Sequence, residues 1–236
     1  GLALGRMTER LWSRPNRSLG TVNGRPLEGR LMASNYVLEA TNTRAARRLA
    51  LAQNGIGQAV QATPLAMAAA AASIASGYVI APYIAGSRPD PRPPLFGVNP
   101  DLDARLGPLD ATIANQLLAQ LREGMRQVVN HPRGTAHRAF QGRGFASRVS
   151  GKTGTAEVSE RRDVPNSVWF IGWLDQPNIK GLQGRRLAFS CMVTHVARGS
   201  SGGEVCAPTI ARLLARFEGE ALDAAPPVPD RGGRRR

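Results

Sequence analysis

The stretch VSGKTGTA, residues 149–156, is the part of the sequence from which the fold is best predicted. It lies in the first of three strand-like runs that glycine and proline clusters separate. Gly151 and Gly154 carry no side chain, so the backbone of a ligand can come close to the strand at both positions. An exposed strand edge also offers N–H and C=O groups to an extended peptide. The stretch therefore predicts a strand that lines a peptide-binding cleft.

Three side chains of this strand could contact such a ligand. Lys152 is a fixed cation, and the hydroxyl groups of Thr153 and Thr155 can bind a carboxylate. Alternation puts the two threonines on the face opposite Lys152, although at the edge of a cleft both sets can reach a ligand. A tight glycine-containing strand with a surface lysine would show the same Lys-Thr-Gly-Thr pattern, so the pattern alone does not identify a site.

The region around this strand shows the period of a sheet. Strand-like runs cover residues 147–159, 167–174 and 186–196, with glycine and proline clusters between them. Such spacing favours an antiparallel meander. The Pro-, Gly- and Arg-rich end at 219–236 is predicted to be a disordered tail, which leaves residues 1–218 as one domain.

Helices are predicted before and after the sheet region in the sequence. Thr63 is a good N-cap before Pro64, and the helix that follows is expected to end at Gly77. Helices at 110–130 and 207–218 each show an apolar stripe that we interpret as core. The stripe residues are Ile113, Leu117, Leu118, Leu121, Met125 and Val128 in the first, and Ile210, Leu213, Leu214 and Phe217 in the second. Residues 1–50 are predicted to be mainly loop, with a short helix at 43–53, and residues 86–108 a second loop.

Further blocks accompany the Lys-Thr-Gly-Thr strand in a fixed order. They are GIGQ (55–58), ATPLAMA (62–68), REGMRQVV (122–129), GTA (134–136), WFIGW (169–173), and Gly202-Gly203 with Ala207-Pro208. Together they make about residues 1–218 resemble the later part of the transpeptidase domain of class B penicillin-binding proteins. Serine β-lactamases and D,D-carboxypeptidases share the lysine motif, but GIGQ and ATPLAMA favour the transpeptidase.

The resemblance implies an α/β fold in which helices flank an antiparallel sheet, here incomplete on its N-terminal side. It implies a peptidoglycan D,D-transpeptidase that cross-links stem peptides ending in D-Ala-D-Ala, binds β-lactams, and lies on the extracytoplasmic face of the bacterial inner membrane. The resemblance implies that Lys152, in the lysine motif, is catalytic: it positions the substrate and tunes the proton network. Thr153, Gly154 and Thr155 bind substrate, with the Thr155 N–H as half of an oxyanion hole. No metal or cofactor is implied.

The nucleophile of that mechanism is absent from the sequence. The chemistry needs a serine with a lysine three residues on, yet the chain has two lysines, and Val149 and Pro177 stand three residues before them. No Ser-x-Asn motif occurs either. In the family both motifs precede GIGQ, and the 54 residues before Gly55 are too few to hold that region.

Two explanations of the missing serine stay open. The chain could be a fragment of a longer transpeptidase, which its non-methionine start favours. It could instead be a non-catalytic module that binds or scaffolds protein partners in the cell envelope. Either way we expect no acyl transfer by the chain as given. A fragment would also leave apolar faces uncovered and fold marginally.

Composition and cysteine usage bear on three other possibilities: nucleic-acid binding, a metal site and a disulfide. The net charge of +14 suggests an anionic partner, of which nucleic acid is the obvious one. Aromatic residues make up only 5% and do not interleave with the arginines as base stacking requires, so nucleic acid is disfavoured. Neither the three histidines (His131, His137 and His195) nor the two cysteines show metal spacing. Cys191 and Cys206 could pair in an oxidising compartment or be two separate buried thiols.

One uncharged stretch, residues 65–87, is long enough to cross a membrane. It consists mostly of alanine, which inserts weakly, and Gly77 and Pro82 interrupt it. A buried helix followed by a strand is therefore the prediction.

Overall fold

The computed structural model describes residues 60–78, 80, 111–156 and 165–220, together with strand segments at 21–22, 25–26 and 30–31. The predicted helix at 43–53, the predicted loop at 86–108 and the tail from residue 221 onward lie outside the described residues.

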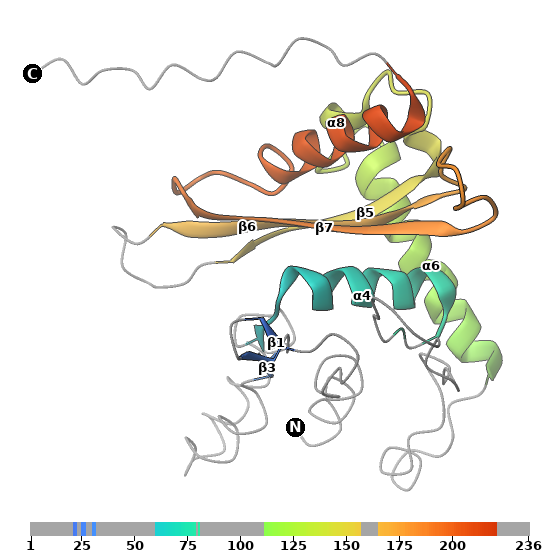
Figure 1. The fold of residues 1–236 in the computed structure, drawn as a ribbon, viewed down its shortest axis with the longest axis horizontal. Helices are drawn as coiled ribbons and strands as arrows, with labels where there is room; N and C mark the ends of the chain where they lie inside the picture. The colour runs from blue at the N-terminus through green and yellow to red at the C-terminus, as the bar shows by residue number, and fades with distance from the viewer. Residues whose placement is uncertain are drawn as a thin grey trace, which may run out of the picture.

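A three-stranded antiparallel sheet forms the centre of the described structure (Figure 1). Its strands are β5 (Val149–Ala156), β6 (Asn166–Asp175) and β7 (Arg186–Val196), in the order β5-β6-β7. The predicted meander is thereby confirmed. The first strand starts at residue 149 because the three residues before it form a short 3-10 helix, η1 (Ala146–Arg148).

Helices cover both faces of this sheet. The helix α8 (Cys206–Glu218) packs on one face and contacts α7 (His137–Phe140), while α4 (Pro64–Ser76) packs on the other against β6 and β7. A long helix, α6 (Ala111–Asn130), runs past the sheet beside β5, where the side-chain amide of Asn130 donates to the carbonyl of Val149 at 3.1 Å. The predicted α/β class, an antiparallel sheet flanked by helices, is confirmed.

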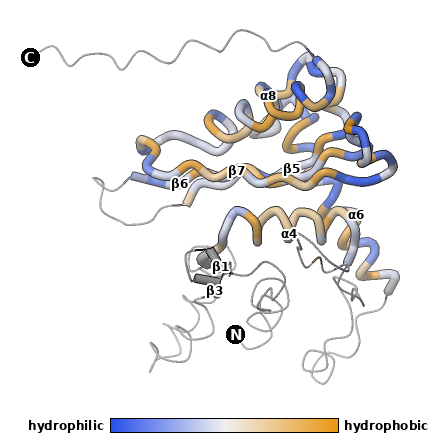
Figure 2. The backbone as a smooth tube through the Cα atoms, in the orientation of Figure 1, coloured by the Kyte–Doolittle hydropathy of each residue, from blue (hydrophilic) through white to orange (hydrophobic). Residues whose placement is uncertain are grey.

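The main core lies between the sheet and α8. Four phenylalanines form a chain of ring contacts there, with centroids 6.3 Å apart for Phe140 and Phe145, 5.9 Å for Phe140 and Phe170, and 5.3 Å for Phe170 and Phe189. The apolar colouring along the strands in Figure 2 follows this packing. A smaller core on the α4 face joins Ala75, Met125 and Trp173.

Two glycines make room for these rings. Gly151 in β5 lies directly opposite Gly172 in β6. A Cβ atom added at Gly151 would lie 2.6 Å from Cε2 of Phe170, and one added at Gly172 would lie 2.1 Å from the carbonyl oxygen of Ser150. The same atom at Gly172 would lie 2.7 Å from Cζ of Phe189. The aromatic core thus covers backbone that has no side chains of its own.

The start and end predicted for α4 are confirmed. The Thr63 hydroxyl accepts from the N–H of Ala66 at 3.2 Å, Pro64 opens the helix, and Gly77 ends it with φ +83°. Its alanines let the helix lie close on β6 and β7. Among the helices of the described ranges, none has both the length and the apolar character of a membrane span.

The apolar stripes of the other two helices are only partly core, which corrects the sequence prediction. In α6 the side chains of Leu118 and Met125 are buried, but Ile113, Leu117 and Leu121 are 41–49% exposed. In α8 the side chains of Ile210 and Leu214 are buried, but Leu213 and Phe217 are 44% and 42% exposed. The reason is that small residues share the contact face, among them Ala114 in α6 and Ala207, Ala211 and Ala215 in α8. Each stripe is therefore wider than the surface that the sheet covers.

Short strand pairs involve residues 1–50, the region predicted to be mainly loop. Strand β1 (Thr21–Val22) pairs with β2 (Arg25–Pro26), and β3 (Arg30–Leu31) pairs with β4 (Val60–Gln61). Strands of two residues are too short to show an alternating pattern, so the sequence gives no sign of them.

Candidate functional site

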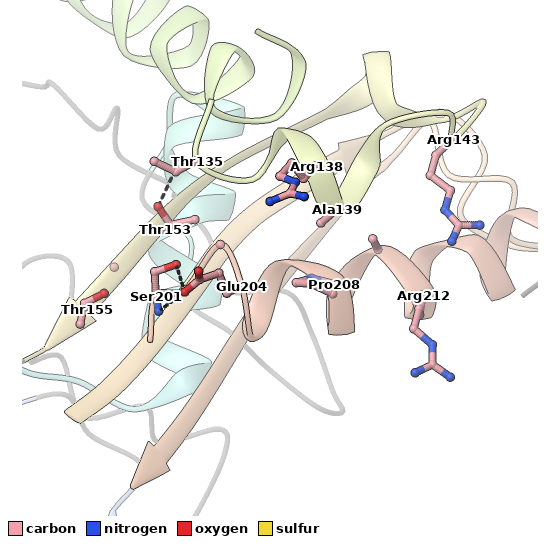
Figure 3. A pocket seen from close by; sticks show the side chains of 14 residues that line it. Thr135, Arg138, Ala139, Arg143, Thr153, Thr155, Ser201, Glu204, Pro208 and Arg212 are labelled. Carbon is pink, nitrogen blue, oxygen red and sulfur yellow. Dashed lines mark hydrogen bonds between the residues drawn. The ribbon is translucent and has the colours of Figure 1, made fainter. Parts of the chain in front are cut away.

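A cleft of about 890 Å³ opens on the α8 face of the sheet, along the end of β5 (Figure 3). Four parts of the chain meet in it: the strand β5, the segment 135–143 that includes α7, the loop that follows β7, and the first turns of α8. Its lining consists of Thr135, Arg138, Ala139, Arg143, Thr153, Gly154, Thr155, Ser201, Gly202, Gly203, Glu204, Pro208, Ala211 and Arg212.

The strand wall of the cleft carries three of the four residues predicted as site residues. Thr153, Gly154 and Thr155 all line it. Thr153 is 9% exposed, and its hydroxyl oxygen lies 2.7 Å from that of Thr135, so the two share a hydrogen bond. Thr155 is exposed at the open end of the strand. Two hydroxyl groups and a glycine therefore follow one another along the wall.

Lys152 lies apart from these three residues. Its register partner is Ile171, whereas Thr153 and Thr155 pair with Phe170 and Val168, so alternation directs Lys152 to the opposite face. Its ammonium group donates to the carbonyl oxygen of Thr153 at 2.5 Å, and the side chain is otherwise exposed. The structure thus places the lysine against the backbone of the cleft strand and outside the cleft lining.

A turn between Ser201 and Glu204 stabilises the loop after β7. The N–H and the hydroxyl of Ser201 each lie 3.0 Å from Oε2 of Glu204, and the N–H of Glu204 donates to the carbonyl of Ser201 at 3.1 Å. Glu204 thus closes a tight turn that comes just before α8, whose N-cap is Val205. Its Ser-x-x-Glu spacing is visible in the sequence and could have identified both residues, which the sequence analysis did not single out.

Two glycines allow that loop to pack closely against the backbone around the cleft. A Cβ atom added at Gly202 would lie 2.0 Å from the carbonyl oxygen of Trp169 and 2.9 Å from that of Gly154. One added at Gly203 would lie 2.0 Å from the carbonyl oxygen of Thr135. A flexible side chain could move away from the added atom, but these backbone oxygens cannot. Only glycine therefore fits at both positions. The blocks GTA, KTGT and GG, far apart in the sequence, therefore meet at one place.

The cleft is electropositive. Arg138, Arg143 and Arg212 line it (Figure 3), and its one lining carboxylate, Glu204, accepts hydrogen bonds from Ser201. The side chain of Arg143 is 13% exposed and lies 3.8 Å from Glu220. Arg138 and Arg212 are exposed and pair with no carboxylate in the described part of the chain. Guanidinium groups beside hydroxyl groups form a site suited to a carboxylate.

Nothing in the described ranges suggests a metal centre, since no three His, Cys, Asp or Glu side chains gather there. The sequence signalled the strand wall of the cleft but not its arginine wall. Arginines are frequent throughout this chain, so neither Arg138 nor Arg212 stands out before the fold brings them to the cleft.

Comparison with known proteins shows the family and the fold of the chain. Residues 34–215 match the penicillin binding protein transpeptidase domain. A complex of penicillin-binding protein PBP2 and MreC from Helicobacter pylori has a similar fold, with a TM-score of 0.55 and 21% identity over 86% of this chain. A structure of PBP2 alone gives a TM-score of 0.49 and 23% identity over 77% of this chain. The chain covers 34% and 29% of those two chains, so it spans about a third of their length. Among curated proteins, no sequence is significantly similar.

Proposed function

This chain belongs to the family of penicillin-binding protein transpeptidase domains, and from that premise we propose that its cleft binds the carboxylate end of a peptidoglycan stem peptide or of a β-lactam. One observation carries the proposal. The Thr153-Gly154-Thr155 wall faces a second wall that contains two arginines with no carboxylate partner in the described residues. Such a pair of walls can hold an extended peptide that ends in a negative charge.

In the proposed complex the peptide lies along β5. Among the described strands β5 pairs only with β6, so its other edge is available to a peptide backbone. The terminal carboxylate accepts from the hydroxyls of Thr153 and Thr155, and Arg138 supplies the positive charge. The N–H of Thr155 takes the place of an oxyanion donor. Lys152 positions the substrate from the edge of β5, where its ammonium already lies against the carbonyl of Thr153.

In this proposal the chain binds the peptide or the β-lactam but does not catalyse acyl transfer. The 236 residues contain no Ser-x-x-Lys, so no serine among them has a lysine one helical turn further along the chain to take its proton. The role in peptidoglycan cross-linking, the extracytoplasmic location and an envelope protein partner belong to the same proposal. A purely scaffolding module is the alternative, and it differs in predicting no affinity for the peptide carboxylate.

Thr153→Val tests the carboxylate contact. Valine keeps the shape of threonine and removes the hydroxyl. We expect the affinity for a peptide that ends in D-Ala-D-Ala to fall about tenfold or more, because a hydrogen bond to a charged group contributes about 1.5–3 kcal/mol. Isothermal titration of the chain with the acid and with its C-terminal amide measures this loss.

The amide and a second variant serve as controls. Thr194→Val makes the same change on β7, outside the cleft lining, and should leave the affinity unchanged. If wild type binds the acid and the amide equally, the carboxylate site is wrong. If it binds neither, the scaffolding alternative is supported.

Incubation with a penicillin tests the absence of acyl transfer. We expect the intact mass of the chain to stay unchanged. Circular dichroism on the same sample would check that the chain is folded. A stoichiometric adduct would show an activated serine, and Ser201 beside Glu204 would be the first to replace.

A further inference from the structure

The two cysteines lie on opposite sides of one interface. Cys206 is the first residue of α8, and its side chain is fully buried at 0% exposure. Cys191 lies in β7 between Phe189 and Val193, and all three side chains pack in the core cluster that contains Cys206. Strand and helix thus direct their thiols into the same layer from opposite sides.

The sulfur of Cys206 lies over the part of the sheet that contains Cys191. Its thiol donates to the carbonyl of Val168 at 3.4 Å. Val168 and Phe170 in β6 are the register partners of Val193 and Cys191 in β7. Burial raises the pKa of the Cys206 thiol to about 12, and the neighbouring Cys191 raises it further.

We propose that Cys191 and Cys206 form an intramolecular disulfide that fastens the start of α8 to β7. Thiols that enter one core layer from opposite sides of a packed interface have the opposed orientation that such a bond needs. The loop that it closes, residues 191–206, contains the Ser201–Glu204 turn and both glycines that seat it on the cleft. The bond would therefore hold one wall of the cleft in place.

The reaction is thiol–disulfide exchange, with an external disulfide as oxidant. Cys191 is partly exposed, so its thiolate attacks one sulfur of oxidised glutathione or of a disulfide oxidoreductase and releases one thiolate. Cys206 then loses its proton and attacks the sulfur of Cys191, which expels the second thiolate. Two protein thiols are oxidised, one external disulfide is reduced to two thiols, and their two protons pass to the leaving thiolates. The raised pKa of Cys206 makes the second step faster as pH rises.

Glutathione buffers provide the test. The purified chain is equilibrated at graded ratios of oxidised to reduced glutathione, unfolded in an alkylating reagent, and weighed. We expect oxidised monomer to have lost two hydrogen atoms and to take up no reagent, and a peptide map to join residues 191 and 206. Closing a loop of roughly 15 residues should raise the melting midpoint of the oxidised form by about 5–10 °C over that of the reduced form.

Cys191→Ala and Cys206→Ala are the matched controls, and each should melt at a midpoint that does not depend on the glutathione ratio. The comparison of oxidised with reduced wild type does not require that either variant folds. Full alkylation of both cysteines after oxidation of a folded chain would overturn the proposal. A disulfide found only between two copies would do the same. None of these measurements uses a peptide or a β-lactam, so the result is independent of the proposed function.

Discussion

Gly172→Ala is expected to lower the free energy of unfolding by about 3 kcal/mol or more. The new Cβ would lie 2.1 Å from the carbonyl oxygen of Ser150 and 2.8 Å from Cα of Gly151, both in the backbone of the neighbouring strand. It would also push the ring of Phe189, which lies 2.7 Å from that position. The strands can relieve the overlap only by separating, which breaks ladder hydrogen bonds and opens the aromatic core. Urea denaturation followed by tryptophan fluorescence measures the loss.

Gly154→Ala is the matched control in the same pair of strands. Its Cβ would make one ordinary contact, 3.5 Å from Cβ of Trp169. Alanine restricts the unfolded chain more than glycine, so this variant should be unchanged or more stable by about 0.5–1 kcal/mol. Equal stability losses in the two variants would mean that the close approach at Gly172 does not limit stability.

Arg148→Met is expected to cost about 2–4 kcal/mol. The Arg148 guanidinium pairs with the carboxylate of Glu218, whose side chain is 6% exposed, and donates to the carbonyls of Asp175 and Gln176 at 3.3 and 2.5 Å. Methionine keeps most of the apolar stem but leaves that carboxylate without its charge partner, which is costly in a buried setting. Because Arg148 is 33% exposed, water offsets part of the loss, and the expectation is set below the value for a fully buried pair.

Arg186→Met provides the comparison. Arg186 pairs with Asp175 at 2.6 Å, but the two side chains are 52% and 40% exposed. Exposed ion pairs contribute at most about 1 kcal/mol, so this variant should lose no more than that. Thermal melts of both variants at low and high salt would separate the two cases. Similar losses for Arg148 and Arg186 would contradict the role given to burial.

Much of the fold could be predicted from local pattern. The meander follows from three strand-like runs with turn residues between them, and α4 follows from the Thr63-Pro64 start and the glycine at 77. Burial of the helices was predicted less well. An apolar stripe shows which face of a helix can be buried, but the extent of burial depends on the size of the partner surface. Leu117 and Leu213 are exposed for this reason.

The candidate site was predicted on one side only. The strand wall has a local motif, so Thr153, Gly154 and Thr155 could be named from the sequence, whereas Arg138 and Arg212 become site residues only through the fold. The position of Lys152 shows a limit of motif reasoning as well. A motif names adjacent residues together, but a strand directs neighbours to opposite faces. The sequence likewise left open whether the two cysteines are neighbours, because their contact depends on how α8 returns over β7.

The order of elements along the chain also bears on how the protein reaches this structure. Strands β5, β6 and β7 and helix α8 follow one another in sequence, and each packs against a neighbour in that series. Contacts between sequence neighbours close short loops, so the α8 side of the sheet can condense early and fast. Helix α4 packs on β6 and β7 from far earlier in the chain, and its docking must close a much longer loop. The two faces of one sheet are therefore expected to form at different stages of folding, with the cleft face first.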